Sequence, residues 1–86
     1  MTYTVEYENK AFKSLMNIPK KERISIKNAI DRLAIDPAAK SNVKKLLNRP
    51  GYRLRVGKFR VLYEIDFRSE EILIVSIGHR KSVYRR

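Results

Sequence analysis

The sequence has 86 residues, 43% of them hydrophobic, which suits one globular domain (residues 1–86) with a modest core. Its formal net charge is +11, and residues 37–86 hold 13 of the 20 basic residues but only 4 of the 9 acidic ones, so this part should attract phosphates or acidic proteins. The absence of cysteine excludes disulfides and thiolate chemistry. No apolar run approaches the ~18–20 residues of a membrane helix, and no secretory signal opens the chain, so we expect a cytoplasmic protein.

The first third of the chain predicts a strand and two helices. Residues 2–7 alternate between apolar and polar side chains, which is typical of a strand. A short helix capped by Glu8 or Asn9 should end near Ile18, because the residue before Pro19 is disfavoured in a helix. Its expected core stripe is Phe12, Leu15 and Met16.

A second helix is predicted from Pro19 to Asp36. Proline suits the first turn of a helix, and the Asp36-Pro37 pair should end it. Its apolar stripe is Ile26, Ala29, Ile30 and Leu33. The short connection favours an antiparallel helical hairpin, and both helices need a sheet to cover because neither would be stable alone.

Residues 37–50 form the least regular part of the chain. We expect a loop with one helical turn at most, in which Val43, Leu46 and Leu47 dock on the core. Residues 52–56 and 59–65 then alternate as two strands around Gly57-Lys58, and glycine at the first turn position favours a two-residue type II′ hairpin.

The last predicted strand, residues 71–77, follows a turn at residues 66–70 and carries apolar side chains on both faces. Simple alternation puts Ile72 and Ile74 on one face and Leu73, Val75 and Ile77 on the other, which is typical of a central strand covered on both sides. The predicted fold is therefore α+β: an N-terminal strand, a helical hairpin and a three-stranded antiparallel meander, with the helices on one face of a small sheet. The N-terminal strand should pair with the last strand or with an edge of the meander.

Three arginines of the predicted hairpin should share one face. If the turn is right, Val56 pairs with Phe59, Arg55 lies opposite Arg60, and Arg53 is one pair further along. Like charges directly across two strands are destabilising, so such a face indicates a site for an anion. The alternative is an ordinary solvated outer face of a sheet.

Further candidate groups follow the last strand. His79, Arg80 and Tyr84 are expected to come close to the arginine face. Arginine binds phosphate in a bidentate way, and histidine or tyrosine can move a proton. One histidine and no cysteine make a dedicated zinc site poorly supported, and there is no glycine-rich phosphate loop. Such a patch suits metal-independent cleavage of RNA, whose own 2′-hydroxyl is the nucleophile.

The segments YRLRVGKFRVLYEI (52–65) and SIGHRKSVYRR (76–86), together with the helix pair, resemble the RelE/ParE superfamily of type II toxins. Within it the chain looks more like the RelE branch, and this implies an endonuclease that cuts mRNA in the ribosomal A site. The resemblance also implies a RelB-like, acidic antitoxin that holds the toxin inactive in a hetero-oligomer. No metal or cofactor is expected.

The family's catalytic pattern corresponds here to Arg53, Arg55, Arg60, Arg80 and Tyr84. The best-known relatives carry lysines where this chain has Arg53 and Arg55. Arginine stays protonated, so Tyr84 or His79 is the expected proton acceptor. General attraction of RNA is assigned to Lys44, Lys45, Lys58 and Lys81. The alternatives are a ParE-like inhibitor of DNA gyrase and a non-catalytic basic RNA-binding module.

Overall fold

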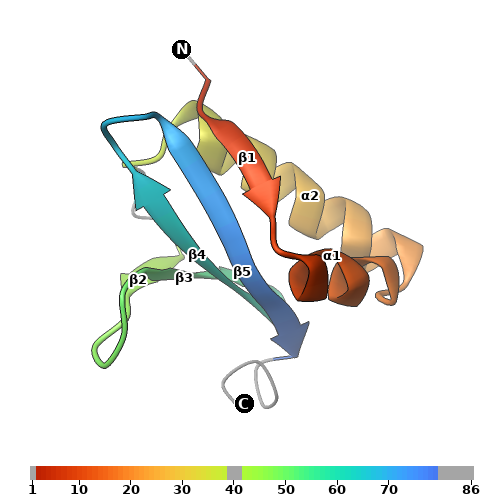
Figure 1. The fold of residues 1–86 in the computed structure, drawn as a ribbon. Coiled ribbons are helices and arrows are strands. Elements are labelled where there is room, and N and C mark those ends of the chain that lie inside the picture. Colours follow the sequence, from red (N-terminus) through yellow and green to blue (C-terminus); the bar gives the residue numbers. More distant parts are fainter. Residues whose placement is uncertain (1, 39–41, 80–86) are drawn as a thin grey trace.

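Two helices lie against one face of a five-stranded sheet in the computed structural model, which describes residues 2–38 and 42–79 (Figure 1). In chain order the elements are β1 (Thr4–Tyr7), α1 (Asn9–Met16), α2 (Lys20–Ile35), β2 (Val43–Lys45), β3 (Tyr52–Val56), β4 (Phe59–Asp66) and β5 (Glu71–His79). The predicted α+β class is confirmed. Within the described residues, neither helix is long and apolar enough to cross a membrane.

The strand order is β1-β5-β4-β3-β2, and every neighbouring pair is antiparallel except β1 and β5. The parallel pairing of β1 with the last strand confirms one of the two partners that the sequence allowed. The prediction of a loop between Pro37 and Pro50 is wrong in one part, because residues 43–45 form β2 at the sheet edge. Three residues with two lysines are too short to show an alternating pattern, although short, charged strands are common at sheet edges.

The core lies between the helices and the sheet. The predicted stripe of α2 is confirmed, since Ile26, Ile30 and Leu33 are buried. The predicted stripe of α1 is wrong in two of its three positions: Phe12 and Met16 remain 50% and 45% exposed. This two-turn helix instead buries Ala11 and Leu15, which are spaced i, i+4.

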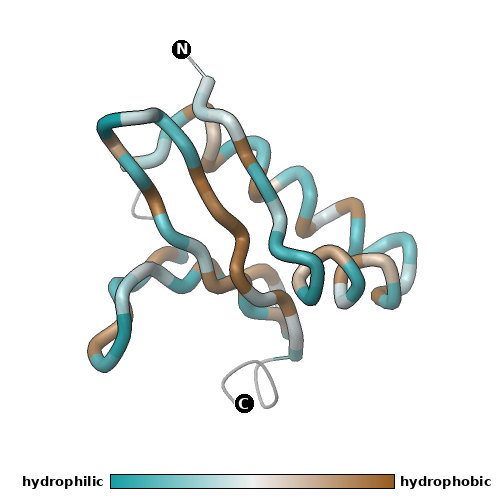
Figure 2. Tube along the Cα trace, viewed as in Figure 1, coloured by the Kyte–Doolittle hydropathy of each residue, from teal (hydrophilic) through white to brown (hydrophobic). Residues whose placement is uncertain are grey.

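A β-bulge shifts the pattern of β5. Leu62 of β4 pairs with Ser76, and the next residue, Tyr63, pairs with Ile74, so Val75 is an extra residue in β5. The extra residue brings Ile77 to the same face as Ile72 and Ile74, and these three isoleucines are buried (0–3% exposed). The prediction that Ile77 shares a face with Leu73 and Val75 is therefore wrong. Figure 2 shows the hydrophobic residues along the middle of β5.

The sheet face opposite the helices, here called the outer face, is covered in its middle by the chain between β2 and β3. Leu46, Arg49 and Pro50 line a small hollow of 60 Å³ together with Leu62, Tyr63, Glu64 and Val75. Leu62 is only 2% exposed although it lies outside the core beneath the helices. Val43 packs against that core as expected, but Leu47 is 96% exposed, so its predicted docking is wrong.

Replacing Tyr63 with phenylalanine is expected to stabilise the protein by about 1–3 kcal/mol at neutral pH and by more at alkaline pH. The side chain is 1% exposed, its ring stacks on Tyr52 at 5.6 Å, and its hydroxyl has no hydrogen-bond partner among the described residues. Burial, and then the nearby Tyr52, raise the pKa of Tyr63 to about 12. An unpartnered buried hydroxyl costs about 1–3 kcal/mol.

The sign of the pH effect follows from the raised pKa. Above pH ~10 the unfolded tyrosine releases its proton while the folded one keeps it, so this contribution to stability is lost as the pH rises from ~10 to ~12. Urea titrations of both proteins at several pH values measure the difference, which should grow by roughly 2–3 kcal/mol over this range. A constant difference would contradict the prediction.

Candidate functional site

The β3–β4 hairpin closes with the predicted turn. Gly57 has a φ of +59°, and among the described non-glycine residues only Asn42 and Glu70 have a positive φ. Lys58 therefore has a negative φ, and the combination is that of a type II′ turn. A two-residue turn leaves a single register for the two strands, so it fixes which side chains face each other.

The register places three arginines on the outer face, as predicted. Val56 pairs with Phe59, and Arg55 lies directly opposite Arg60. Arg53 is two residues before Arg55 and pairs with Leu62. Directly opposite residues have Cβ atoms about 5 Å apart, and residues i and i+2 of a strand are separated by about 7 Å. The three arginine side chains therefore extend from adjacent positions on the same face of the sheet.

Lys44 joins this group from the edge strand. It pairs directly with Arg53, so its side chain lies on the same outer face. Lys44, Arg53 and Arg55 line a hollow of 280 Å³ together with Asn42 and Val43. We call Lys44, Arg53, Arg55 and Arg60 the basic face. From the sequence we predict only a general attraction of RNA for Lys44, because a strand of three residues is too short to show an alternating pattern.

Several charges of the basic face are open to a ligand. Arg60 Nη1 donates hydrogen bonds to the carbonyl oxygens of Phe59 (3.2 Å) and Gly57 (3.5 Å), so this side chain reaches the hairpin turn. Lys44 and Arg55 are exposed and form no ion pair within the described part of the chain. An incoming phosphate therefore does not have to displace a carboxylate from either residue.

Acidic residues lie at the opposite end of the sheet. Glu6, Glu64, Asp66 and Glu71 line another hollow, of 490 Å³, which also includes Phe67 and Leu73. Backbone N–H groups of Ser69 and Arg68 donate hydrogen bonds to Asp66 Oδ1 (3.1 and 2.9 Å) and lower the pKa of this carboxyl, so it stays ionised. The two ends of the sheet therefore carry opposite charge, and a phosphate is attracted to the hairpin end.

The predicted grouping of His79 with the arginines is wrong. His79 pairs with Phe59, which packs against the core on the helix side, and their ring centroids are 6.0 Å apart. Lys45 pairs with Tyr52, so it also faces away from the basic face, whereas Lys58 lies in the exposed hairpin turn. Arg80, Lys81 and Tyr84 lie outside the described residues.

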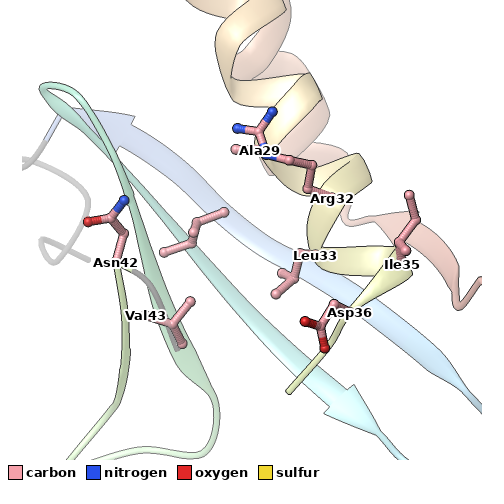
Figure 3. Close-up of a pocket in the computed structure, with 8 residues that line it drawn as sticks. Ala29, Arg32, Leu33, Ile35, Asp36, Asn42 and Val43 are labelled. Carbon is pink, nitrogen blue, oxygen red and sulfur yellow. The ribbon is translucent and has the colours of Figure 1, made fainter. Parts of the chain in front are cut away.

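The helix side has a cleft of its own. It measures 420 Å³ and lies between the C-terminal half of α2 and the strands β2 and β3, where mostly apolar side chains face one another (Figure 3). Arg32 and Asp36 are its charged members. Asn42 and Val43 line both this cleft and the hollow of the basic face, so the two meet at the edge strand β2 from opposite sides of the sheet. Within residues 2–38 and 42–79, no three histidine, aspartate or glutamate side chains gather as a metal site would require.

A family model and a relative of known sequence both match almost the whole chain. The family model described as "ParE toxin of type II toxin-antitoxin system, parDE" matches residues 5–84. A relative named RelE1, from Methanocaldococcus jannaschii, is 31% identical over 88 residues, which cover 99% of this chain and 98% of that protein.

Solved structures share the fold over almost the whole chain. The toxin of an archaeal RelE–RelB complex from Pyrococcus horikoshii OT3 is 28% identical with a TM-score of 0.82, covering 95% of this chain and 99% of that one. A chain of the RelBE2 toxin–antitoxin complex from Mycobacterium tuberculosis is 25% identical with a TM-score of 0.79, covering 93% of this chain and 100% of that one.

Proposed function

This chain belongs to the RelE/ParE superfamily of type II toxin–antitoxin toxins, and on that premise we propose that it cleaves mRNA on the ribosome without a metal ion. The observation that carries this proposal is the basic face, in which three arginines and a lysine occupy adjacent positions on one side of the sheet. The relatives from Methanocaldococcus and Pyrococcus, which match almost the whole chain, carry the name RelE. This favours a RelE-like activity over a ParE-like one.

The basic face suits the transition state of RNA cleavage by the neighbouring 2′-hydroxyl. The attack adds negative charge to the phosphate, and fixed guanidinium groups stabilise this charge without needing to reorganise. Arg53 and Arg55 line the hollow from β3, and Arg60 lies directly opposite Arg55 on β4. The products are a 2′,3′-cyclic phosphate and a 5′-hydroxyl end. DNA lacks the attacking hydroxyl and is not a substrate for this reaction.

A proton acceptor is needed for the 2′-hydroxyl. Guanidinium groups cannot serve, because they stay protonated. The expected proton acceptors from the sequence are Tyr84 and His79. Because His79 lies on the helix side of the sheet, we favour Tyr84. The proposed set is therefore Arg53, Arg55 and Arg60 for the phosphate, with Arg80 and Tyr84 assigned by resemblance.

Cleavage on programmed ribosomes tests the proposal. Purified protein is added to ribosomes that hold an mRNA codon in the A site, and primer extension maps the ends. We expect cleavage within that codon, and a single 2′-O-methyl group at the cleaved nucleotide should abolish it, because the nucleophile is then blocked. Absence of cleavage, or cleavage that tolerates the methyl group, would contradict the proposed reaction.

The proposed partner is a RelB-like antitoxin. The solved relatives from Pyrococcus and Mycobacterium are toxin–antitoxin complexes. This chain's charge of +11 favours an acidic partner segment that binds it in a hetero-oligomer. Co-expression of the cognate antitoxin should restore growth to cells that express the toxin.

A second candidate function is inhibition of DNA gyrase. It is favoured by the family model, whose description names the ParE toxin. Gyrase inhibition would cause DNA damage without mRNA cleavage, so primer extension on mRNA from expressing cells, alongside a gyrase supercoiling assay, separates the two candidates.

A further inference from the structure

We propose that Lys44 is a catalytic residue that gives a proton to the oxygen leaving the phosphorus. The inference rests on the proposed RNA cleavage and adds a proton donor to it. Three observations support it: the position of Lys44 in the edge strand, its access to the hollow of the basic face, and the chemistry of its neighbours.

The edge strand holds Lys44 firmly in register. Arg55 N donates a hydrogen bond to Asn42 O at 2.9 Å on one side of it, and Leu46 N donates one to Gly51 O at 3.0 Å on the other. Both bonds continue the ladder in which Lys44 pairs with Arg53. Val43 is partly buried against the core, so alternation directs Lys44 to the outer face.

Lys44 also lies where a phosphate would bind. It lines the 280 Å³ hollow with Arg53 and Arg55, and it is exposed without an ion pair among the described residues. A phosphate held by the two arginines therefore lies within the reach of a lysine side chain. The ammonium group has no carboxylate partner in that part of the chain that would hold it away.

The chemistry of the basic face leaves the donor role to Lys44. Its other three members are arginines, whose guanidinium groups do not release a proton in proteins. A lysine ammonium carries a compact charge and can release one. The lysine therefore brings to this surface a property that the arginines lack.

The 2′-hydroxyl loses its proton to the acceptor, and its oxygen forms a bond to phosphorus. The bond between phosphorus and the 5′-oxygen breaks, its electron pair goes to that oxygen, and Lys44 Nζ supplies the proton that completes the 5′-hydroxyl. The acceptor then releases its proton to solvent water and the lysine takes one up from solvent water, so no net proton is gained or lost. General acid catalysis of this kind contributes about 10²- to 10⁴-fold in rate.

A leaving-group substitution tests the role directly. The K44R variant keeps the positive charge but removes the proton donor. K27R is its matched control, since Lys27 is an exposed lysine of α2, on the helix side of the sheet, where it pairs with Asp31 at 3.2 Å. The substrates are a ribosome-bound mRNA and the same mRNA with sulfur in place of the bridging 5′-oxygen at the cleavage site. A thiolate leaves without needing a proton.

We expect K44R to slow cleavage of the oxygen substrate by about 10²- to 10⁴-fold and to cleave the sulfur substrate as fast as the unaltered protein. K27R should cleave both substrates at the normal rate. Equal losses on the two substrates, or no loss on either, would contradict the donor role while leaving the proposed function intact. If the unaltered protein cleaves neither substrate, the proposed function fails and the role of Lys44 with it.

Discussion

Replacing Arg55 with alanine is expected to lower ribosome-dependent mRNA cleavage by about 10²- to 10³-fold and to abolish growth arrest, because a preorganised donor to the developing phosphate charge is removed. Arg55 is exposed, lines the hollow of the basic face and lies directly opposite Arg60. The folded state should tolerate the change, since surface substitutions usually alter stability by less than about 0.5 kcal/mol and the loss relieves a like-charge pair.

Arg68→Ala is the matched control. It removes the same side chain and the same charge, but Arg68 lies in the exposed turn between β4 and β5, at the acidic end of the sheet. Single-turnover cleavage on programmed ribosomes, with thermal unfolding of each variant, gives both quantities. A folded R55A protein with full activity would contradict the role of Arg55 in the basic face. An equal loss in R68A would show that the net charge matters and the position of the arginine does not.

Arg60→Ala should show a loss similar to that of R55A, and the double variant should lose less than the product of the two single losses. The reason is that both guanidinium groups are proposed to act on one phosphate, and residues that act as a unit are not additive. If the loss of cleavage rate in the double variant equals the product of the losses in R55A and R60A, the two arginines act at independent sites.

The hairpin was predictable because two local rules agree there. A glycine-led two-residue turn sets the register, and strict alternation sets the faces, so Arg53, Arg55 and Arg60 were placed together correctly. The edge strand was not predictable because three residues cannot show a period, so the position of Lys44 beside Arg53 needed the structure. In α1, two turns offer several candidate stripes, and only tertiary packing selects Ala11 and Leu15.

One extra residue explains two of the errors in β5. Counting by twos from Ile72 puts Ile77 and His79 on the face opposite Ile72, where the basic face lies. The bulge at Val75 reverses this parity, so both residues face the helices. A bulge depends on how two strands pair, and nothing in the composition of ILIVSIGH marks the extra residue. The placement of His79, and with it the choice between two proton acceptors, therefore needed the structure.

Replacing Gly51 with alanine is expected to destabilise the fold by about 2–5 kcal/mol, from backbone strain together with a forced close contact. Gly51 has a φ of +108°, and a Cβ atom there would lie 2.6 Å from the carbonyl oxygen of Tyr63. That oxygen belongs to the backbone of β4, so it cannot move aside without disturbing the sheet. A domain of this size has roughly 5–10 kcal/mol of stability, so the loss is a large part of it.

Gly57→Ala is the control that separates strain from contact. Gly57 also has a positive φ, +59°, but no atom lies within 4 Å of the position of an added Cβ. This variant should lose only about 1–2 kcal/mol, the cost of the left-handed backbone conformation. Urea unfolding of both variants measures the difference, and equal losses would show that the contact with Tyr63 contributes nothing.

The G51A variant should also affect the basic face, because Gly51 lies next to the edge strand that carries Lys44. Gly51 ends the segment that covers the middle of the outer face, and its carbonyl accepts the hydrogen bond from Leu46 N that closes the ladder beside Lys44. Forcing Gly51 away from Tyr63 should therefore loosen β2 before the rest of the sheet. Hydrogen exchange at Leu46 should accelerate in G51A more than exchange in β5, and cleavage should fall in step with it. Uniform acceleration across the sheet would instead indicate that the edge strand and the core unfold as one unit.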